Sequence, residues 1–141
     1  MTKTRTEIKR SPQKVSPRRA SHPVPGLIGS LLQFELAKET EQLRQEDAWN
    51  TTSRNAKTLV KYADLRIVLM AMKSGIRMEG HKADGSVSIQ GLTGNLRVHL
   101  ANQTVEVPAG RLLTLERGLP HDVEAMEDSS FLLTISWPRG V

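Results

Sequence analysis

The stretch that decides the fold is GHKADGSVSIQGLTG, residues 80–94. It begins and ends with glycine, and its ADG segment, residues 83–85, has the composition of a turn. In SVSIQ, residues 86–90, apolar and polar side chains alternate, which predicts a half-buried strand because successive strand residues point to opposite faces. His81 is the one strong metal-binding residue type in the stretch. The stretch therefore predicts a turn followed by a strand, with a single imidazole beside the turn.

Short strands continue through the rest of the chain. The segments with strand composition are KTLVKY (57–62), LRIVLMAMK (65–73), SVSIQGL (86–92), NLRVHL (95–100), QTVEVP (103–108), RLLTL (111–115), HDVEAM (121–126) and FLLTISW (131–137). Clusters of Gly, Asn, Asp, Pro and Ser separate them, as turns require. Strands at this spacing, without helices between them, predict an all-β antiparallel sandwich or barrel.

Length and composition limit the class of protein. The chain has 141 residues, which suits one domain, and no cysteine, which excludes disulfides and thiolate metal sites. No apolar run approaches the roughly 18 residues that a membrane span needs. The first 25 residues also lack the apolar core of a secretory signal. We therefore expect a cytoplasmic protein that does not associate with membranes.

The basic charge of the chain is concentrated at its beginning. Residues 1–25 hold seven Lys and Arg against one Glu, whereas the net charge of the whole chain is +5. Proline and polar residues dominate this segment, so we expect a disordered basic tail at 1–25. Its pieces SPQK (11–14) and SPRR (16–19) resemble minor-groove-binding tails of chromatin proteins, although a solvated extension is the simpler interpretation. The near-neutral remainder does not favour nucleic acid as a partner, except through this tail.

Residues 26–50 show a different pattern from the tail and from the strands. Ile28, Leu32, Leu36 and Leu43 lie near one face of a helix drawn over 27–48. We expect an N-terminal helical segment at 26–50. It would pack against the outside of a barrel formed by residues 51–141, or in a dimer interface.

Two blocks of glycine and histidine stand out within the predicted strands. In order, they comprise Gly75, His81 and Gly94, then Gly110, Gly118 and His121. Their order and spacing resemble the two motifs of the cupin family, G-x5-H-x-H-x3,4-E-x6-G and G-x5-P-x-G-x2-H-x3-N. The resemblance covers about residues 57–137. It implies a small single-domain bacterial cupin, with the double-stranded β-helix known as the RmlC-like jelly roll.

The resemblance also implies a divalent-metal site of three imidazoles and a carboxylate, which this chain keeps only in part. His81 and His121 match the first and last histidines of that site, whereas Ala83 and Val87 stand where the second histidine and the glutamate would be. If the strand is regular, Glu79 shares a face with His81 and completes a site of Glu79, His81 and His121. Two imidazoles alone form a weak, exchangeable site. We therefore predict a degenerate motif that holds no certain cofactor, and at most a weakly bound Fe, Mn, Ni or Zn.

The resemblance places His81 and His121 across the lumen from each other, on neighbouring strands. The predicted inward-facing side chains are Ile67, Leu69, Val87, Ile89, Leu113, Val123 and Leu133. Two neutral imidazoles in an apolar pocket would orient a small ligand through a polar or anionic group. We therefore predict His81 and His121 as ligand-binding residues and assign no catalytic residue. His99 is predicted to lie on the surface of its strand.

Three functions remain open, and the sequence does not decide whether the protein is an enzyme. The first is a protein that binds a small molecule in the barrel lumen. The second is a metal-dependent enzyme, of the dioxygenase or isomerase type, with a reduced ligand set. The third is a regulatory or sensor protein whose basic tail contacts DNA or a partner. The resemblance further implies a homodimer.

Overall fold

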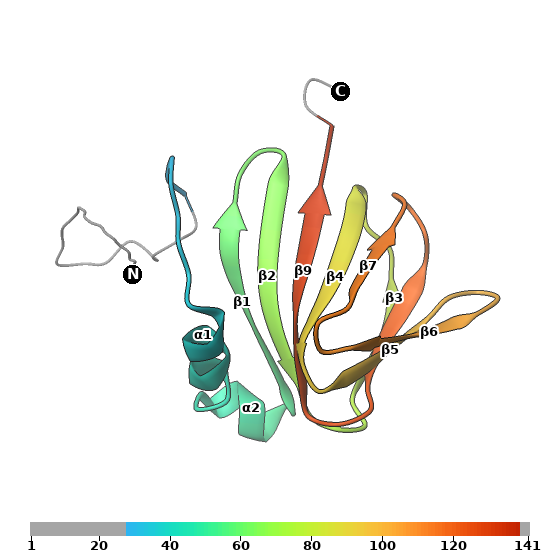
Figure 1. Cartoon of the computed structure of the whole chain (residues 1–141), viewed down its shortest axis with the longest axis horizontal. Coiled ribbons are helices and arrows are strands. Elements are labelled where there is room, and N and C mark those ends of the chain that lie inside the picture. The colour runs from blue at the N-terminus through green and yellow to red at the C-terminus, as the bar shows by residue number, and fades with distance from the viewer. Residues whose placement is uncertain (1–27, 139–141) are drawn as a thin grey trace, which may run out of the picture.

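The computed structural model describes residues 28–138, except for the side chain of His81. Its elements, in chain order, are α1 (Leu36–Leu43), α2 (Asp47–Thr51), β1 (Arg54–Lys61), β2 (Leu65–Met72), β3 (Arg77–His81), β4 (Ser86–Thr93), β5 (Asn95–His99), β6 (Thr104–Pro108), β7 (Leu112–Leu115), β8 (His121–Ala125) and β9 (Ser129–Ser136). Both helices precede the strands, and the strands make up about half of the described residues (Figure 1).

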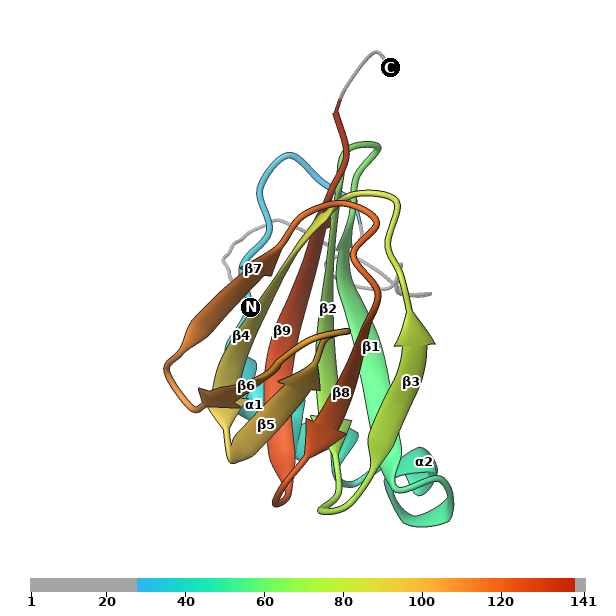
Figure 2. The same cartoon turned by 90° about the vertical axis from the view of Figure 1, so that its right-hand side faces the viewer.

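The strands form two antiparallel sheets that lie face to face. The larger sheet has the order β1-β2-β9-β4-β7, and the smaller has the order β3-β8-β5-β6. Figure 2 shows the smaller sheet in front of the larger one. Strands far apart in sequence are neighbours in both sheets, as in a jelly roll and unlike in a meander. The predicted all-β jelly-roll barrel with an N-terminal helix is confirmed.

Strand β3 was missed by the sequence pattern. Its residues RMEGH contain one large apolar side chain, Met78, between the charged residues Arg77 and Glu79. Such a segment lacks the β-branched and aromatic content by which strands are recognised. It forms a strand because β8 pairs with it along the edge of the smaller sheet.

The main core lies between the two sheets. Its fully buried side chains include Met72, Ile89, Leu96, Val98 and Phe131. They come from alternate positions of strands in both sheets, as expected where one face of each sheet is buried. The predicted inward positions Val87, Ile89, Leu113, Val123 and Leu133 belong to this core or pack against it.

The other two predicted inward residues, Ile67 and Leu69, face the opposite side of the larger sheet. They pack in a second cluster with Leu43 and Trp49 of the helical segment. The inward positions of β2 are instead Met70 and Met72. Strand β2 is apolar on both faces because both are covered, and alternation alone cannot distinguish its two faces.

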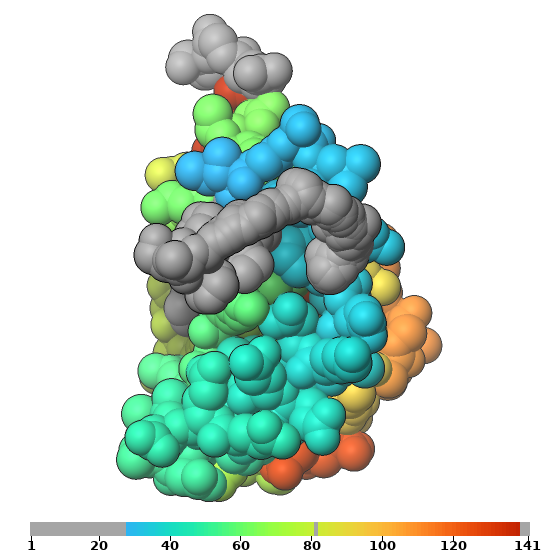
Figure 3. Space-filling model, turned by 90° about the vertical axis from the view of Figure 1, so that its left-hand side faces the viewer, coloured from blue at the N-terminus to red at the C-terminus, as the bar shows by residue number. Residues whose placement is uncertain are grey.

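The helical segment is shorter than predicted. Instead of one helix over 27–48, residues 36–43 and 47–51 form two short helices, and Ile28 and Leu31 are 81% and 77% exposed. Helices of this length depend on tertiary packing, which these two exposed side chains lack, and Gly29 further disfavours a helix there. The helices lie against β1 and β2, and Figure 3 shows them covering the lower part of that face.

Two further expectations concern the basic tail and membrane association. The basic tail, residues 1–25, lies outside the described residues. Within residues 28–138, neither helix has the length and apolar character needed to cross a bilayer.

Candidate binding site at the mouth of the barrel

A cavity of about 310 Å³ opens between the sheets, at the end where β3 finishes and β8 begins. Its walls are the side chains of Met70, Met78, Ala83, Val87, Val123, Phe131, Leu133 and Ile135, together with His121 and Lys82. The volume lies at the lower end of the range of small-molecule pockets. The strands supply the apolar wall. The two basic residues come from the first position of β8 and from the loop after β3.

His121 is a buried imidazole on the cavity wall. Its side chain is 7% exposed, and its Nδ1 lies 3.0 Å from the carbonyl oxygen of Leu119. A carbonyl oxygen can only accept, so Nδ1 carries the hydrogen and donates it. In the neutral ring the lone pair is therefore on Nε2, which makes that atom the acceptor of the ring.

A bulge places the backbone of His81 opposite His121. Met78 pairs with Val123, and the next pair is His81 with His121, so three steps along β3 match two along β8. The extra residue is absorbed at Gly80, whose φ of 72° is left-handed and whose N–H donates to Oδ1 of Asp122 at 2.7 Å. A glycine in this conformation is the usual residue of such a bulge. The predicted juxtaposition of the two histidines thus holds at the level of their Cα positions.

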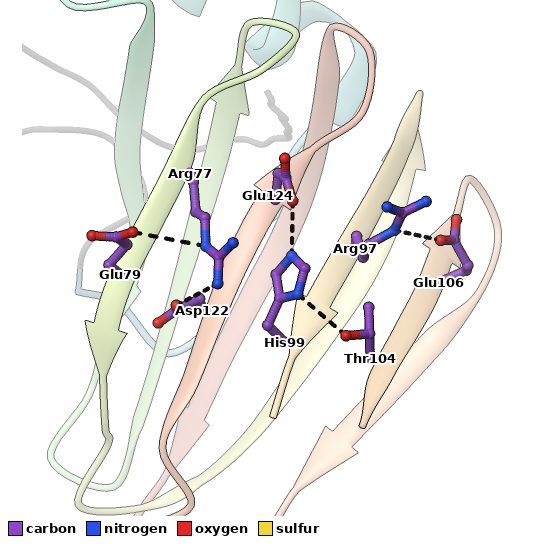
Figure 4. Close-up of polar contacts among 8 residues, drawn as sticks. All are labelled: Arg77, Glu79, Arg97, His99, Thr104, Glu106, Asp122 and Glu124. Atoms are coloured by element: carbon purple, nitrogen blue, oxygen red, sulfur yellow. Dashed lines mark hydrogen bonds and ion pairs between the residues drawn. The ribbon is translucent and has the colours of Figure 1, made fainter. Parts of the chain in front are cut away.

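The side chain of Glu79 does not lie on the face of β3 that was predicted. The expectation that it shares a face with His81 assumed a regular strand, and the bulge makes that assumption wrong. Met78 lines the cavity, and Glu79 points to the outside of the smaller sheet with 74% of its side chain exposed. There its carboxylate lies 3.9 Å from Nε of Arg77 (Figure 4).

The described donor set does not match a metal centre. Ala83 and Val87, at the positions of the second histidine and the glutamate in the resemblance, are apolar residues of the cavity wall. Within the part of the chain that is described, no three His, Cys, Asp or Glu side chains lie together in a ligating arrangement. The described side chains of the cavity offer one imidazole, that of His121, and Lys82 adds a positive charge that opposes a cation.

The outer face of the smaller sheet carries a separate polar network (Figure 4). The ring of His99 lies 2.8 Å from a carboxylate oxygen of Glu124 and 3.2 Å from Oγ1 of Thr104. Next to it, Arg77 pairs with Asp122 at 2.9 Å. His99 is therefore on the strand surface, as predicted, and it faces away from the cavity.

Hydrogen bonds within this outer network favour ionised carboxylates. The N–H of Gly80, and then the guanidinium of Arg77, lower the pKa of Asp122 below its ordinary value of 3.8. Hydrogen bonds from Arg97 and from the side chain of Asn95 lower the pKa of Glu106 in the same way. Asp122 thus links the outer network to the bulge that sets the register of the cavity wall.

Comparison with known proteins identifies the fold but no specific activity. No family model and no curated protein matches the sequence. A conserved protein of unknown function from Streptococcus pyogenes superposes with a TM-score of 0.65 over 86% of this chain and 100% of its own, at 22% identity. A cupin superfamily protein from Desulfitobacterium hafniense gives 0.64 over 83% and 100%, at 11% identity. An RmlC-like cupin from Desulfovibrio desulfuricans gives 0.56 over 60% and 83%, at 23% identity. The chain has the cupin fold.

Several residues of the cupin cavity were not found from the sequence. Lys82 stands in the loop after β3 and has no motif that marks it. Met70 lies on β2, whose two faces are both apolar, and Met78 lies on the missed strand β3. The alternation FLLTI in β9 does contain the signal for Phe131 and Ile135, which are in phase with the predicted Leu133.

The turn before β8 holds the mouth of the cupin barrel together. The N–H of Gly118 donates to the carbonyl oxygen of Ala83 at 2.9 Å, which joins this turn to the loop that carries Lys82. The same turn supplies the Leu119 carbonyl that orients His121. The two basic groups of the cavity are therefore held by hydrogen-bonded backbone.

Proposed function

We propose that this cupin barrel binds a small organic molecule in its cavity, with the apolar part of the ligand inside and a polar group at His121. The observation that carries the proposal is the polarity of the cavity. Eight of its lining residues are apolar, whereas His121 and Lys82 lie at one end. Such a distribution suits an amphipathic ligand of limited size.

The expected affinity is modest. A ligand that buries about 200 Å² of apolar surface gains about 5 kcal/mol at 25 cal/mol per Å², and immobilisation of the ligand consumes part of this gain. A hydrogen bond to a neutral imidazole adds about 1 kcal/mol. We therefore expect dissociation constants from about 100 μM to 1 mM for simple probes.

The direct test is titration with 1-octanol, a neutral probe with an apolar chain, followed by calorimetry. Val123→Phe adds a ring to the cavity wall and should abolish binding of the probe. Leu112→Phe is the matched control because Leu112 is 60% exposed and does not line the cavity; it should bind as the parent does. Binding that survives Val123→Phe in a folded protein would place the probe elsewhere and overturn the proposal.

A metal-dependent enzyme with a reduced ligand set is the second candidate, supported by the pairing of His81 with His121 across β3 and β8. Elemental analysis after dialysis against a weak chelator separates the two candidates. The binding proposal expects well below one equivalent of Fe, Mn, Ni or Zn per chain. Near one equivalent, lost in His121→Gln and kept in His99→Gln, would favour the enzyme.

A further inference from the structure

Arg66 lies on the inward face of the larger sheet, next to the cavity wall. In the regular pairing of β2 with β9, Met70 is opposite Phe131 and Arg66 is opposite Ile135. Met70, Phe131 and Ile135 all line the cavity. Since side chains two and four positions apart on a strand share a face, Arg66 extends that same face beyond Met70, toward the open end of the barrel.

The guanidinium of Arg66 lies against Trp137, but one of its hydrogen-bond donors has no acceptor among the described residues. Its carbon lies 5.6 Å from the ring centroid of Trp137, and the backbone N–H of Trp137 donates to the carbonyl oxygen of Asp64 at 3.0 Å. Nε of Arg66 is buried and has no hydrogen-bond partner among the described residues. A buried donor without an acceptor is costly, so the structure keeps an unused N–H of a planar cation at this position.

The described wall of the cavity carries positive charge and no negative charge. Lys82 is a cation, His121 is an imidazole, and no carboxylate is among the described residues that line the cavity. Arg66 adds a permanent positive charge on the adjoining part of the wall. A ligand with a negative group at its polar end matches this distribution better than a neutral or cationic one.

From these observations we infer that the ligand is an organic acid whose carboxylate lies at the polar end of the cavity, where His121 stands, and is bound there by Arg66, while its apolar chain fills the cavity. The inference rests on the proposed function and names its ligand class. A carboxylate has the geometry to accept from two nitrogens of a guanidinium at once. Trp137 acts as a positioning residue, because the stacked ring restricts the plane of the guanidinium.

The test compares three probes with the same eight-carbon chain, octanoate, 1-octanol and octylammonium, in calorimetric titrations. The parent should bind octanoate about tenfold or more tightly than 1-octanol, and octylammonium most weakly, because charged hydrogen bonds are stronger than neutral ones. Arg66→Met should remove the preference for octanoate and leave 1-octanol binding within about twofold. Arg66→Lys keeps the charge without the two-pronged geometry and should retain only part of the preference.

Arg54→Met is the matched control. It removes the same charge from the exposed opposite end of the β1–β2 pair, where Arg54 is opposite Met72, and should leave all three affinities unchanged. Equal binding of octanoate and 1-octanol by the parent, or equal weakening of both by Arg66→Met, would overturn the inference and leave the proposed function standing. If the parent binds none of the probes, the proposed function fails, and the inference fails with it.

Discussion

At the scale of single residues, Gly80 sets which side chains of β3 reach the cavity. Its left-handed backbone absorbs the extra residue between the pairs Met78–Val123 and His81–His121. A strand without this bulge would move the residues beyond it to the other face. This is why alternation predicted the wrong place for Glu79, while the spacing of glycine and histidine predicted the positions of His81 and His121.

Replacement of Gly80 and of Gly94 by alanine should have different costs. Both have positive φ, 72° and 78°, but a Cβ at Gly80 meets no atom within 4 Å, whereas one at Gly94 would lie 2.3 Å from the carbonyl oxygen of Asp128. Gly80→Ala should lower the free energy of unfolding by about 1–2 kcal/mol, the cost of a left-handed L-residue. Gly94→Ala should lower it by clearly more, because steric overlap with backbone adds to that cost. Urea titrations measure both values, and an equal loss would contradict this distinction.

At the scale of elements, the outer face of the smaller sheet couples stability to pH. Asp122 accepts from Gly80 and pairs with Arg77, so its pKa in the folded protein is below 3.8. A group with a lowered folded pKa stabilises the fold above its unfolded pKa and loses that contribution as the pH falls through the folded value. This part of the stability should therefore be complete near neutral pH and disappear in acid.

The measurement is the urea midpoint of unfolding between about pH 5 and pH 2. The parent should lose stability over this range more steeply than Asp122→Asn, which cannot ionise and can still accept from the Gly80 N–H. Glu127→Gln removes an exposed carboxylate from the turn between β8 and β9 and serves as the control. A parallel pH dependence of the parent and Asp122→Asn would show that Asp122 does not contribute as argued.

The helical segment stabilises the fold without shaping the cavity. Leu43 of α1 is 1% exposed and packs with Leu69 of β2, on the side of the larger sheet away from the cavity. Leu43→Ala should therefore cost about 2–5 kcal/mol of unfolding free energy while the affinity for 1-octanol stays unchanged in the folded protein. Chemical denaturation and calorimetry together test this separation. A weaker affinity at unchanged folded fraction would mean that the helices act on the cavity.

The same elements show how far the sequence predicts the structure. Strands with one polar face, such as β4 and β8, were predicted with the correct inward residues, Val87, Ile89 and Val123. The sequence pattern failed at β2, where both faces are covered, and at β3, where charges and a bulge hide the alternation. Arg66 and Lys82 were not singled out from the sequence, because their positions beside the cavity depend on which strands become neighbours.

At the scale of the whole molecule, the cupin fold was predictable from its turns. The motif glycines Gly75, Gly94, Gly110 and Gly118 all have positive φ, between 78° and 88°. Glycine adopts this conformation without strain, and the spacing of these turns carries part of the resemblance to the cupin family, which implied the jelly roll. The side chains that would complete a metal site are not part of this frame, and the chain lacks two of them, at Ala83 and Val87.

Three further predictions concern the whole molecule. They are the homodimer, the cytoplasmic location and the regulatory role in which the basic tail contacts DNA. The tail at 1–25 lies outside the described residues.

The central claim, that a small molecule occupies the cavity, is tested most directly by NMR of the methionine methyl groups. The chain has five methionines, of which Met70 and Met78 line the cavity, Met72 is buried in the core and Met126 is 36% exposed. Saturable shifts of the Met70 and Met78 signals on addition of octanoate, with Met72 and Met126 unchanged, are the predicted result. Unchanged Met70 and Met78 signals, at concentrations of octanoate up to about 5 mM, would contradict the claim.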